Sequence, residues 1–285
     1  MEIHTQITLT EPIHESMPGS PPIQVQQPLQ TPPQLRLKFR RGKEVMFLSH
    51  LDLMRTFSRA FRRTDIPIGY SKGFNPHMEM IFGLPLQVGV TSDSEYLDIT
   101  LLQKMEPLTI QEKLNKQLPA GIEIISARLK ETKSNIMSAV SHASYKMVVC
   151  YNNNSSVIDR DIDPDSHLVD SAVLIDNLKI AVQEFLALSE VIVTKETKHA
   201  KKDVNIRPLI VSLTVNEDTL LMTVCAGSAE NLKPDLLLEA LNNINLDKKL
   251  PLLSKAALHR TDLFIKQEEC LLEPDDDRVL KSAPV

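Results

Sequence analysis

The feature that most restricts the fold of this chain is the order in which strand and helix patterns follow one another. Between residues 34 and 129 the order is strand, helix, strand, strand, helix, strand, and a second series with similar order follows from residue 145. Helices that alternate with strands in this way pack on a sheet and give each series its own apolar core. We therefore predict an α+β protein with two similar halves.

The first series begins with a period-two pattern, in which three apolar side chains alternate with the basic side chains of Arg36, Lys38 and Arg40. This alternation predicts a half-buried strand whose outer face is basic. Ser49, with Asp52 three residues later, is typical of a helix N-cap, and residues 64–67 end that helix. The remaining predicted elements are strands near 78–82, 95–102 and 122–129 and a helix over 109–118.

The second series consists of a strand over 145–151, a helix over 172–188, strands over 191–195, 209–215 and 220–225, a helix over 234–241 and a strand ending near 265. The order β-α-β-β-α-β is that of the ferredoxin-like fold, with both helices on one face of the sheet and the other face available. We predict two ferredoxin-like domains, over 34–135 and 142–270.

Both ends of the chain lack a core-forming pattern. Residues 1–33 are rich in Pro and Gln, a composition that buries too little apolar surface to order itself, so we expect a disordered leader. Residues 271–285 contain Asp275, Asp276 and Asp277 in succession and are expected to be an acidic, disordered tail.

Composition excludes several classes of protein. No stretch approaches the roughly 18 apolar residues of a membrane span, and no signal-peptide pattern is present, so we expect a cytoplasmic protein. Three widely separated cysteines predict neither a disulfide framework nor a zinc knuckle, and no metal site is predicted. The formal net charge of -5 argues against a surface that is basic throughout.

Positive charge is concentrated between residues 34 and 81, which hold ten Lys or Arg and four Asp or Glu residues. Within this segment Arg55, Arg59 and Arg62 recur at helical spacing and share one face of the predicted helix. Such a stripe of guanidinium groups suits phosphates. The alternative is an ordinary solvated helix face.

The segment over residues 70–77, YSKGFNPH, predicts a shaped loop with a glycine and an Asn-Pro turn. Tyr70 and Phe74 could stack on unpaired bases, with Lys72, Asn75 and His77 beside them, as in proteins that bind single-stranded RNA. The alternative is that the two rings fill the core.

A second basic cluster lies in a predicted loop before residue 209 and includes Lys198, Lys202 and Arg207. These side chains could extend the first basic surface along an RNA strand, or could serve only as solubilising charges. The complete set of candidate RNA-binding residues comprises Arg36, Lys38, Arg40, Arg55, Arg59, Arg62, Tyr70, Lys72, Phe74, Asn75, His77, Lys198, Lys202 and Arg207.

Three residues are candidates for proton transfer: His50, His77 and Asp65. The tripeptide ending at Asp65 resembles the Arg-Thr-Asp of pseudouridine synthases, and paired ferredoxin-like halves also occur in RNA-processing endonucleases. The following Ile66-Pro67 departs from the turn of that synthase motif, and a helix-ending Asp explains the residue equally well.

Six short motifs together resemble the radical-SAM-associated protein family of bacteria, whose members occur alone or fused C-terminal to radical-SAM proteins. The motifs are FLSHLD at 47–52, YSKGFNPH at 70–77, LPL at 84–86, VGV at 88–90, EYLD at 95–98 and DVNIRP at 203–208. The resemblance covers everything but the two tails, and the long Pro- and Gln-rich leader departs from the family's usual short start.

The resemblance implies a radical-SAM enzyme as partner and a link to RNA or ribosomes. This chain has no Cys-x3-Cys-x2-Cys triplet, so an iron–sulfur cluster and S-adenosylmethionine are expected only in the partner. We expect an accessory protein that binds RNA and presents it to that enzyme. An RNA-acting enzyme and a protein-protein adaptor are the alternatives.

Overall fold

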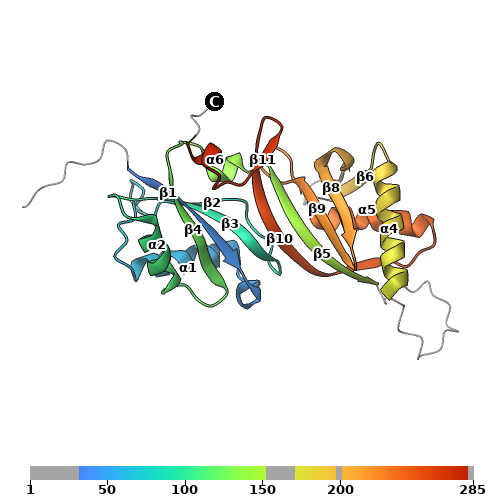
Figure 1. Cartoon of the computed structure of the whole chain (residues 1–285), viewed down its shortest axis with the longest axis horizontal. Helices are drawn as coiled ribbons and strands as arrows, with labels where there is room; N and C mark the ends of the chain where they lie inside the picture. The colour runs from blue at the N-terminus through green and yellow to red at the C-terminus, as the bar shows by residue number, and fades with distance from the viewer. Residues whose placement is uncertain (1–31, 152–170, 197–200, 282–285) are drawn as a thin grey trace, which may run out of the picture. The chain divides into compact units, whose positions relative to one another are not determined.

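The computed structural model describes residues 32–151, 171–196 and 201–281, and the chain from Pro32 onward is one compact unit. The protein is α+β, with strands from both halves of the chain joined in a large mixed sheet (Figure 1). The first half comprises β1 (Gln34–Arg41), a 3-10 helix (Lys43–Val45), α1 (His50–Arg62), β2 (Met80–Phe82), β3 (Thr91–Thr100), α2 (Pro107–Asn115) and β4 (Ile122–Lys130).

The short helix α3 (Ile136–Ala139) leads into the second half. That half comprises β5 (His142–Tyr151), α4 (Ser171–Ala187), β6 (Ile192–Glu196), β7 (Lys201–Asn205), a 3-10 helix (Arg207–Leu209), β8 (Ile210–Asn216), β9 (Thr219–Cys225), α5 (Pro234–Asp247), β10 (Leu253–Gln267), β11 (Cys270–Leu272) and α6 (Asp277–Lys281).

The two halves arrange their strands in the same way. If the strands of the large sheet are counted along the chain in each half, the order is fourth, first, third, second. In the first half the order is β4-β1-β3-β2, and in the second it is β10-β5-β9-β8, with every neighbouring pair antiparallel. The halves join where β10 runs parallel to β3, with His259 opposite Thr91 and Arg260 opposite Ser92. The two sets of strands therefore belong to one continuous sheet.

Each half has its own apolar core. In the first, the side chains of β1 that alternate with the basic ones, Leu35, Leu37 and Phe39, are buried against Phe57 and Phe61 of α1. The second core lies between its strands and helices α4 and α5, and it includes Leu86 and Val90 from the first half. Burying these apolar side chains drives each helix onto the sheet.

Two predictions about loops and tails are wrong. The basic segment expected to be a loop before residue 209 contains β7, which pairs with β6 in a separate two-stranded sheet. Residues 271–281 are not a disordered tail, because β11 pairs with β10 and α6 buries Val279 and Leu280. The predicted leader lies outside the described residues except for its last two.

Candidate nucleic-acid interface

Helix α1 presents three arginines on its outer face. Its N-cap Ser49 accepts a hydrogen bond from the backbone N–H of Asp52, as the sequence predicted, and this fixes the start of the helix. Arg55, Arg59 and Arg62 are all exposed. Arg55 lies 3.2 Å from Asp52, whereas no salt bridge involves Arg59 or Arg62 among the described residues. Their guanidinium groups are therefore available to an anion.

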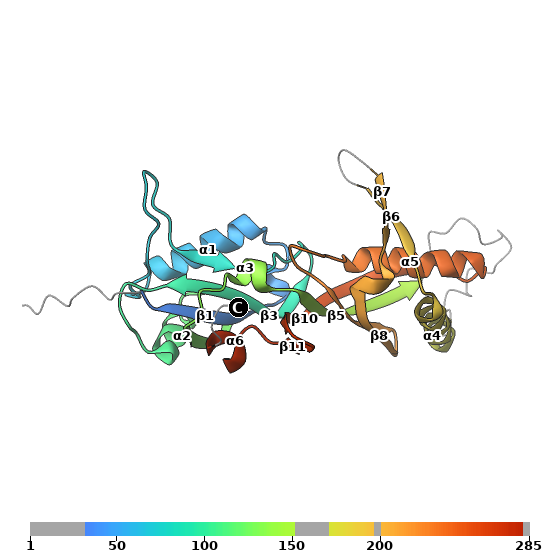
Figure 2. The same cartoon turned by 90° about the horizontal axis from the view of Figure 1, so that it is seen from above.

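A finger formed by residues 70–78 projects beyond α1 (Figure 2). Its two sides are held together by a backbone hydrogen bond from Ser71 to the carbonyl of His77, 2.8 Å long, and by a 2.8 Å contact between Ser71 Oγ and His77 Nδ1. Gly73 adopts a φ of 134°, which favours glycine, at the turn. The finger has a defined shape without a core of its own.

The aromatic side chains of the finger face water. Phe74 is fully exposed at 106% and Tyr70 is 45% exposed, so neither ring fills the core. Lys72, Asn75 and His77 are exposed as well. Aromatic side chains are enriched where a protein binds a partner. The finger thus combines an uncovered apolar ring with a cation and hydrogen-bonding groups.

The basic face expected along β1 is not exposed. Arg36 is fully buried: its Nε and Nη2 donate to the carboxylate of Asp98 at 2.7 and 2.8 Å, and its Nη1 donates to the carbonyl of Pro274 at 2.8 Å. The Nζ of Lys38 lies 2.5 Å from Glu273. The prediction that Arg36 and Lys38 contact RNA is therefore wrong, because another part of the chain covers them.

The covering segment is the C-terminal strap, which we define as residues 273–281. Asp275 accepts hydrogen bonds from the hydroxyls of Tyr96 and Ser126, at 3.0 and 2.9 Å. Its backbone carbonyl accepts from Arg128, at 3.1 Å. Burial and the nearby carboxylates of the strap raise the pKa of Tyr96. The sheet face that we expected to be open is thus occupied by the protein's own acidic segment.

The remaining candidate RNA-binding residues do not form one surface with α1. Arg40 of β1 is exposed and pairs with Glu123. Lys198 lies outside the described residues. Lys202 is exposed on β7, and Arg207 is half-buried in the following 3-10 helix, both in the second half. The candidates of α1 and of the finger are therefore the ones that are exposed on neighbouring segments of the first half.

The candidates for proton transfer have structural partners. Asp65 forms an ion pair with Lys113, and this hydrogen bond holds the pKa of the Asp65 carboxyl below its ordinary value. The ring of His50 packs edge-on against Phe82, and burial lowers the pKa of His50. His77 contacts Ser71 in the finger. The three residues lie on different elements: the start of α1, the loop after it and the finger.

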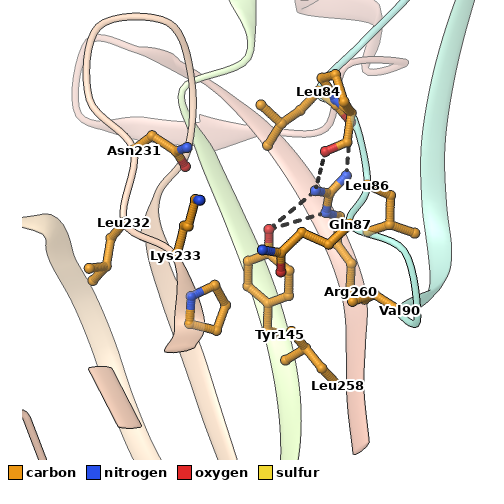
Figure 3. Close-up of a pocket in the computed structure, with 12 residues that line it drawn as sticks. Leu84, Leu86, Gln87, Val90, Tyr145, Asn231, Leu232, Lys233, Leu258 and Arg260 are labelled. Carbon is orange, nitrogen blue, oxygen red and sulfur yellow. Dashed lines mark hydrogen bonds between the residues drawn. The ribbon is translucent and has the colours of Figure 1, made fainter. Parts of the chain in front are cut away.

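The structure also contains a pocket that the sequence analysis missed. It is lined by the loop over residues 84–90, by Tyr145 and Arg260 from the sheet, and by the start of α5 (Figure 3). These segments are far apart in the sequence, and no local motif marks them as a group. Only the LPL and VGV motifs at 84–86 and 88–90 fall within this site.

Other classes of site are not evident in the described part of the chain. Within residues 32–151, 171–196 and 201–281, no group of three or more His, Cys, Asp or Glu side chains is placed to hold a metal ion. Over the same residues, no helix has the length and apolarity that crossing a bilayer requires.

The chain belongs to a bacterial family described as an uncharacterized protein conserved in bacteria, DUF2344, which matches residues 34–234. No curated protein matches the chain. This membership assigns no activity.

Two solved structures show a distant likeness. One is the crystal structure of a Cbf5-Nop10-Gar1 complex, 12% identical, with a TM-score of 0.38; the match covers 83% of this chain and 50% of that chain, so the chain spans about half of its length. The other is a dye-decolorizing protein from V. cholerae, 9% identical, with a TM-score of 0.18 and coverage of 80% and 92%. At these scores neither likeness supports a statement about function.

Proposed function

We propose that this protein binds single-stranded RNA with the outer face of α1 and the finger. The observation that carries the proposal is the fully exposed Phe74 of the finger, which follows a helix whose Arg59 and Arg62 form no salt bridge among the described residues. Guanidinium groups bind phosphates, and an exposed ring stacks on an unpaired base. The two features together suit a strand that runs from α1 to the finger.

Single-stranded RNA fits this surface better than a duplex. In a duplex the bases are stacked on one another, so an aromatic side chain reaches them only in loops, bulges and ends. Phe74 and Tyr70 supply two rings, and Lys72 supplies a cation on the same finger. Stacking of this kind contributes about 1–3 kcal/mol per base and tolerates any sequence. We therefore expect modest sequence preference and strong dependence on salt.

We further propose that the protein works as a cytoplasmic accessory that presents RNA to a radical-SAM enzyme. The support is the resemblance of its motifs to the radical-SAM-associated family, together with the absence of a cysteine triplet in this chain. The iron–sulfur cluster and S-adenosylmethionine would then belong to the partner. We also propose that both halves are ferredoxin-like, which the strand orders β4-β1-β3-β2 and β10-β5-β9-β8 support.

The adaptor alternative rests on the same finger, because Phe74 could also insert into a groove on a protein. The enzyme alternative has less support, since Asp65 is held by Lys113 and its lowered pKa makes it a weak base. The arginine stripe favours RNA over a protein groove, because phosphates occur at regular spacing along the strand.

The proposal is tested by measuring the affinity for single-stranded RNA at several salt concentrations. Replacing Arg59 and Arg62 together with Ala should reduce the slope of log K against log salt by about 1.4, since each phosphate contact with a single strand contributes about 0.7. Phe74→Ala should weaken binding by about 1–3 kcal/mol and leave the slope unchanged.

The matched control replaces two exposed lysines of the second half, Lys248 and Lys266, with Ala. It removes the same charge and should leave the slope unchanged if the contacts are local. Equal effects of the two double variants would show that binding depends only on the net charge of the protein, and this would contradict the proposal. Binding that is independent of salt would contradict it as well.

A further inference from the structure

The pocket in Figure 3 has a volume of about 280 Å³ and lies between parts of both halves. One wall is the loop that joins β2 to β3, and the other is the segment that enters α5. The walls are mostly apolar and include Leu84, Leu86, Val90, Leu232 and Leu258. Pockets with apolar walls and few polar groups are typical of sites for small organic molecules.

A lysine stands at the mouth of this pocket, at an unusual place in a helix. Lys233 is the N-cap of α5, makes no side-chain capping hydrogen bond, and precedes Pro234 at the first helical position. A cation is unfavourable at a helix N-terminus, where the free N–H groups already create a positive potential. Lys233 is exposed and its amino group points into the space between the two walls (Figure 3).

The carboxylates near the pocket are already engaged. Asp235, in the first turn of α5, forms an ion pair with Lys255. Glu95 is buried and accepts two hydrogen bonds from Nη1 of Arg260, at 2.9 and 3.1 Å. Among the described residues no carboxylate forms a salt bridge with Lys233. The positive charge of Lys233 is therefore not neutralised by a salt bridge.

The floor of the pocket adds to this positive potential. Arg260 donates to Tyr145 Oη, at 3.3 and 3.2 Å, and to the carbonyls of Leu84 and Pro85. Behind it the buried guanidinium of Arg41 interacts with the same Glu95, and its Nε has no hydrogen-bond partner. Glu95 forms its salt bridge with Arg260, so this buried region holds two guanidinium groups near one carboxylate. This excess of positive charge favours an anion in the pocket.

We propose that this pocket binds a small organic monocarboxylate, with its carboxylate at Lys233 and its hydrocarbon body against the leucine-lined walls. A charged hydrogen bond from the ammonium would hold the anionic end, and apolar burial would hold the remainder. A bare phosphate would leave the apolar walls uncovered. An organic amine would meet uncompensated positive charge.

The test uses three probes of equal length, hexanoate, hexanol and hexylamine, titrated into the full-length protein at neutral pH and followed by methyl NMR. Hexanoate should bind most tightly and shift the methyl signals of Leu232, Leu258 and Val90. Lys233→Gln should weaken hexanoate about ten-fold, the factor that corresponds to 1.4 kcal/mol, and leave hexanol unchanged. Lys233→Glu should reverse the preference and favour hexylamine.

The matched control is Lys248→Gln, which removes the same charge at the other end of α5 and should leave hexanoate binding unchanged. Folding of Lys233→Glu is expected to be intact, because an acidic residue suits a helix N-terminus. The proposal is overturned if hexanoate does not bind, if hexylamine binds equally well, or if Lys233→Gln has no effect. If inorganic phosphate displaces hexanoate at equal concentration, the claim that the apolar walls bind the hydrocarbon body is overturned.

Discussion

His50 lies in the first turn of α1 with its ring edge-on to Phe82, and the ring centroids are 5.5 Å apart. Burial lowers its pKa, and the nearby Arg41 lowers it further. His142 on β5 has the same property, since burial, aided by Lys266, lowers its pKa against the opposing effect of Glu230. Protonation would place a positive charge in a poorly solvated site near another cation, so each imidazole resists taking up a proton in the folded chain.

These two histidines predict a loss of stability on mild acidification. A histidine whose pKa is lowered by folding binds fewer protons in the folded chain than in the unfolded chain. Its contribution to the free energy of unfolding is therefore complete above the pKa of the unfolded chain, about 6.5, and decreases as the pH falls below that value. We expect the free energy of unfolding, measured with urea, to fall between pH 7.5 and 5.5. Replacing both residues with Asn should flatten this fall.

The pH range of 7.5 to 5.5 distinguishes the effect of the histidines from that of the carboxylates. Asp276, whose hydrogen bonds from Arg278 lower its pKa to about 2, loses its stabilising effect only at much lower pH. His77→Asn is the control, because that side chain is exposed in the finger. An equal flattening by His77→Asn, or no flattening by the double variant, would refute this account of the pH dependence.

At the scale of elements, the C-terminal strap shows which kinds of contact hold a segment on the sheet. Its ion pair between Asp277 and Arg128 is exposed, and exposed pairs contribute little. Its apolar contacts are buried, since Val279 is 3% and Leu280 1% exposed. The backbone carbonyl of Leu280 also accepts hydrogen bonds from Glu131 and Thr132. Apolar burial therefore contributes most to holding the strap in place.

This balance gives a prediction with a built-in comparison. Leu280→Ala should lower the free energy of unfolding by about 2–3 kcal/mol, because it removes a fully buried side chain. Asp277→Asn, three residues away, should change it by less than about 1 kcal/mol. Denaturation in urea measures both. A larger loss from Asp277→Asn than from Leu280→Ala would show that the strap is held electrostatically.

The strap also explains where prediction from the sequence succeeded and where it failed. Helix α1 and the finger depend on neighbours within a few residues, and the cap at Ser49 was predicted correctly. Whether the rings of Tyr70 and Phe74 are exposed or fill the core was left open by the sequence, and the structure exposes them. The burial of Arg36 depends on Pro274, 238 residues away, and the alternation of side chains in a strand does not reveal what covers its second face. The pocket that contains Lys233 and Arg260 is likewise formed by residues far apart in the sequence, so the sequence did not reveal it.

At the scale of the whole molecule, one buried ion pair joins the two halves of the sheet. Arg260 on β10 pairs with Glu95 on β3, and both side chains are almost fully buried. The guanidinium also donates to carbonyls at Leu84 and Pro85 in the first half and to the hydroxyl of Tyr145 in the second. Because these contacts cross the junction, the two cores should unfold together.

We therefore expect wild-type protein to unfold in one cooperative transition, with circular dichroism and tyrosine fluorescence coinciding in urea. Arg260→Met removes the only salt bridge of the buried Glu95 and leaves Arg41 as its one cationic neighbour among the described residues, which should cost about 3–5 kcal/mol. It should also separate the transition into two, one for each core. Replacing Glu95 with Gln in the same chain should restore part of the loss, since the buried carboxylate that lost its salt bridge is gone. A single transition of undiminished midpoint in Arg260→Met would show that pairing of β3 with β10 alone couples the halves.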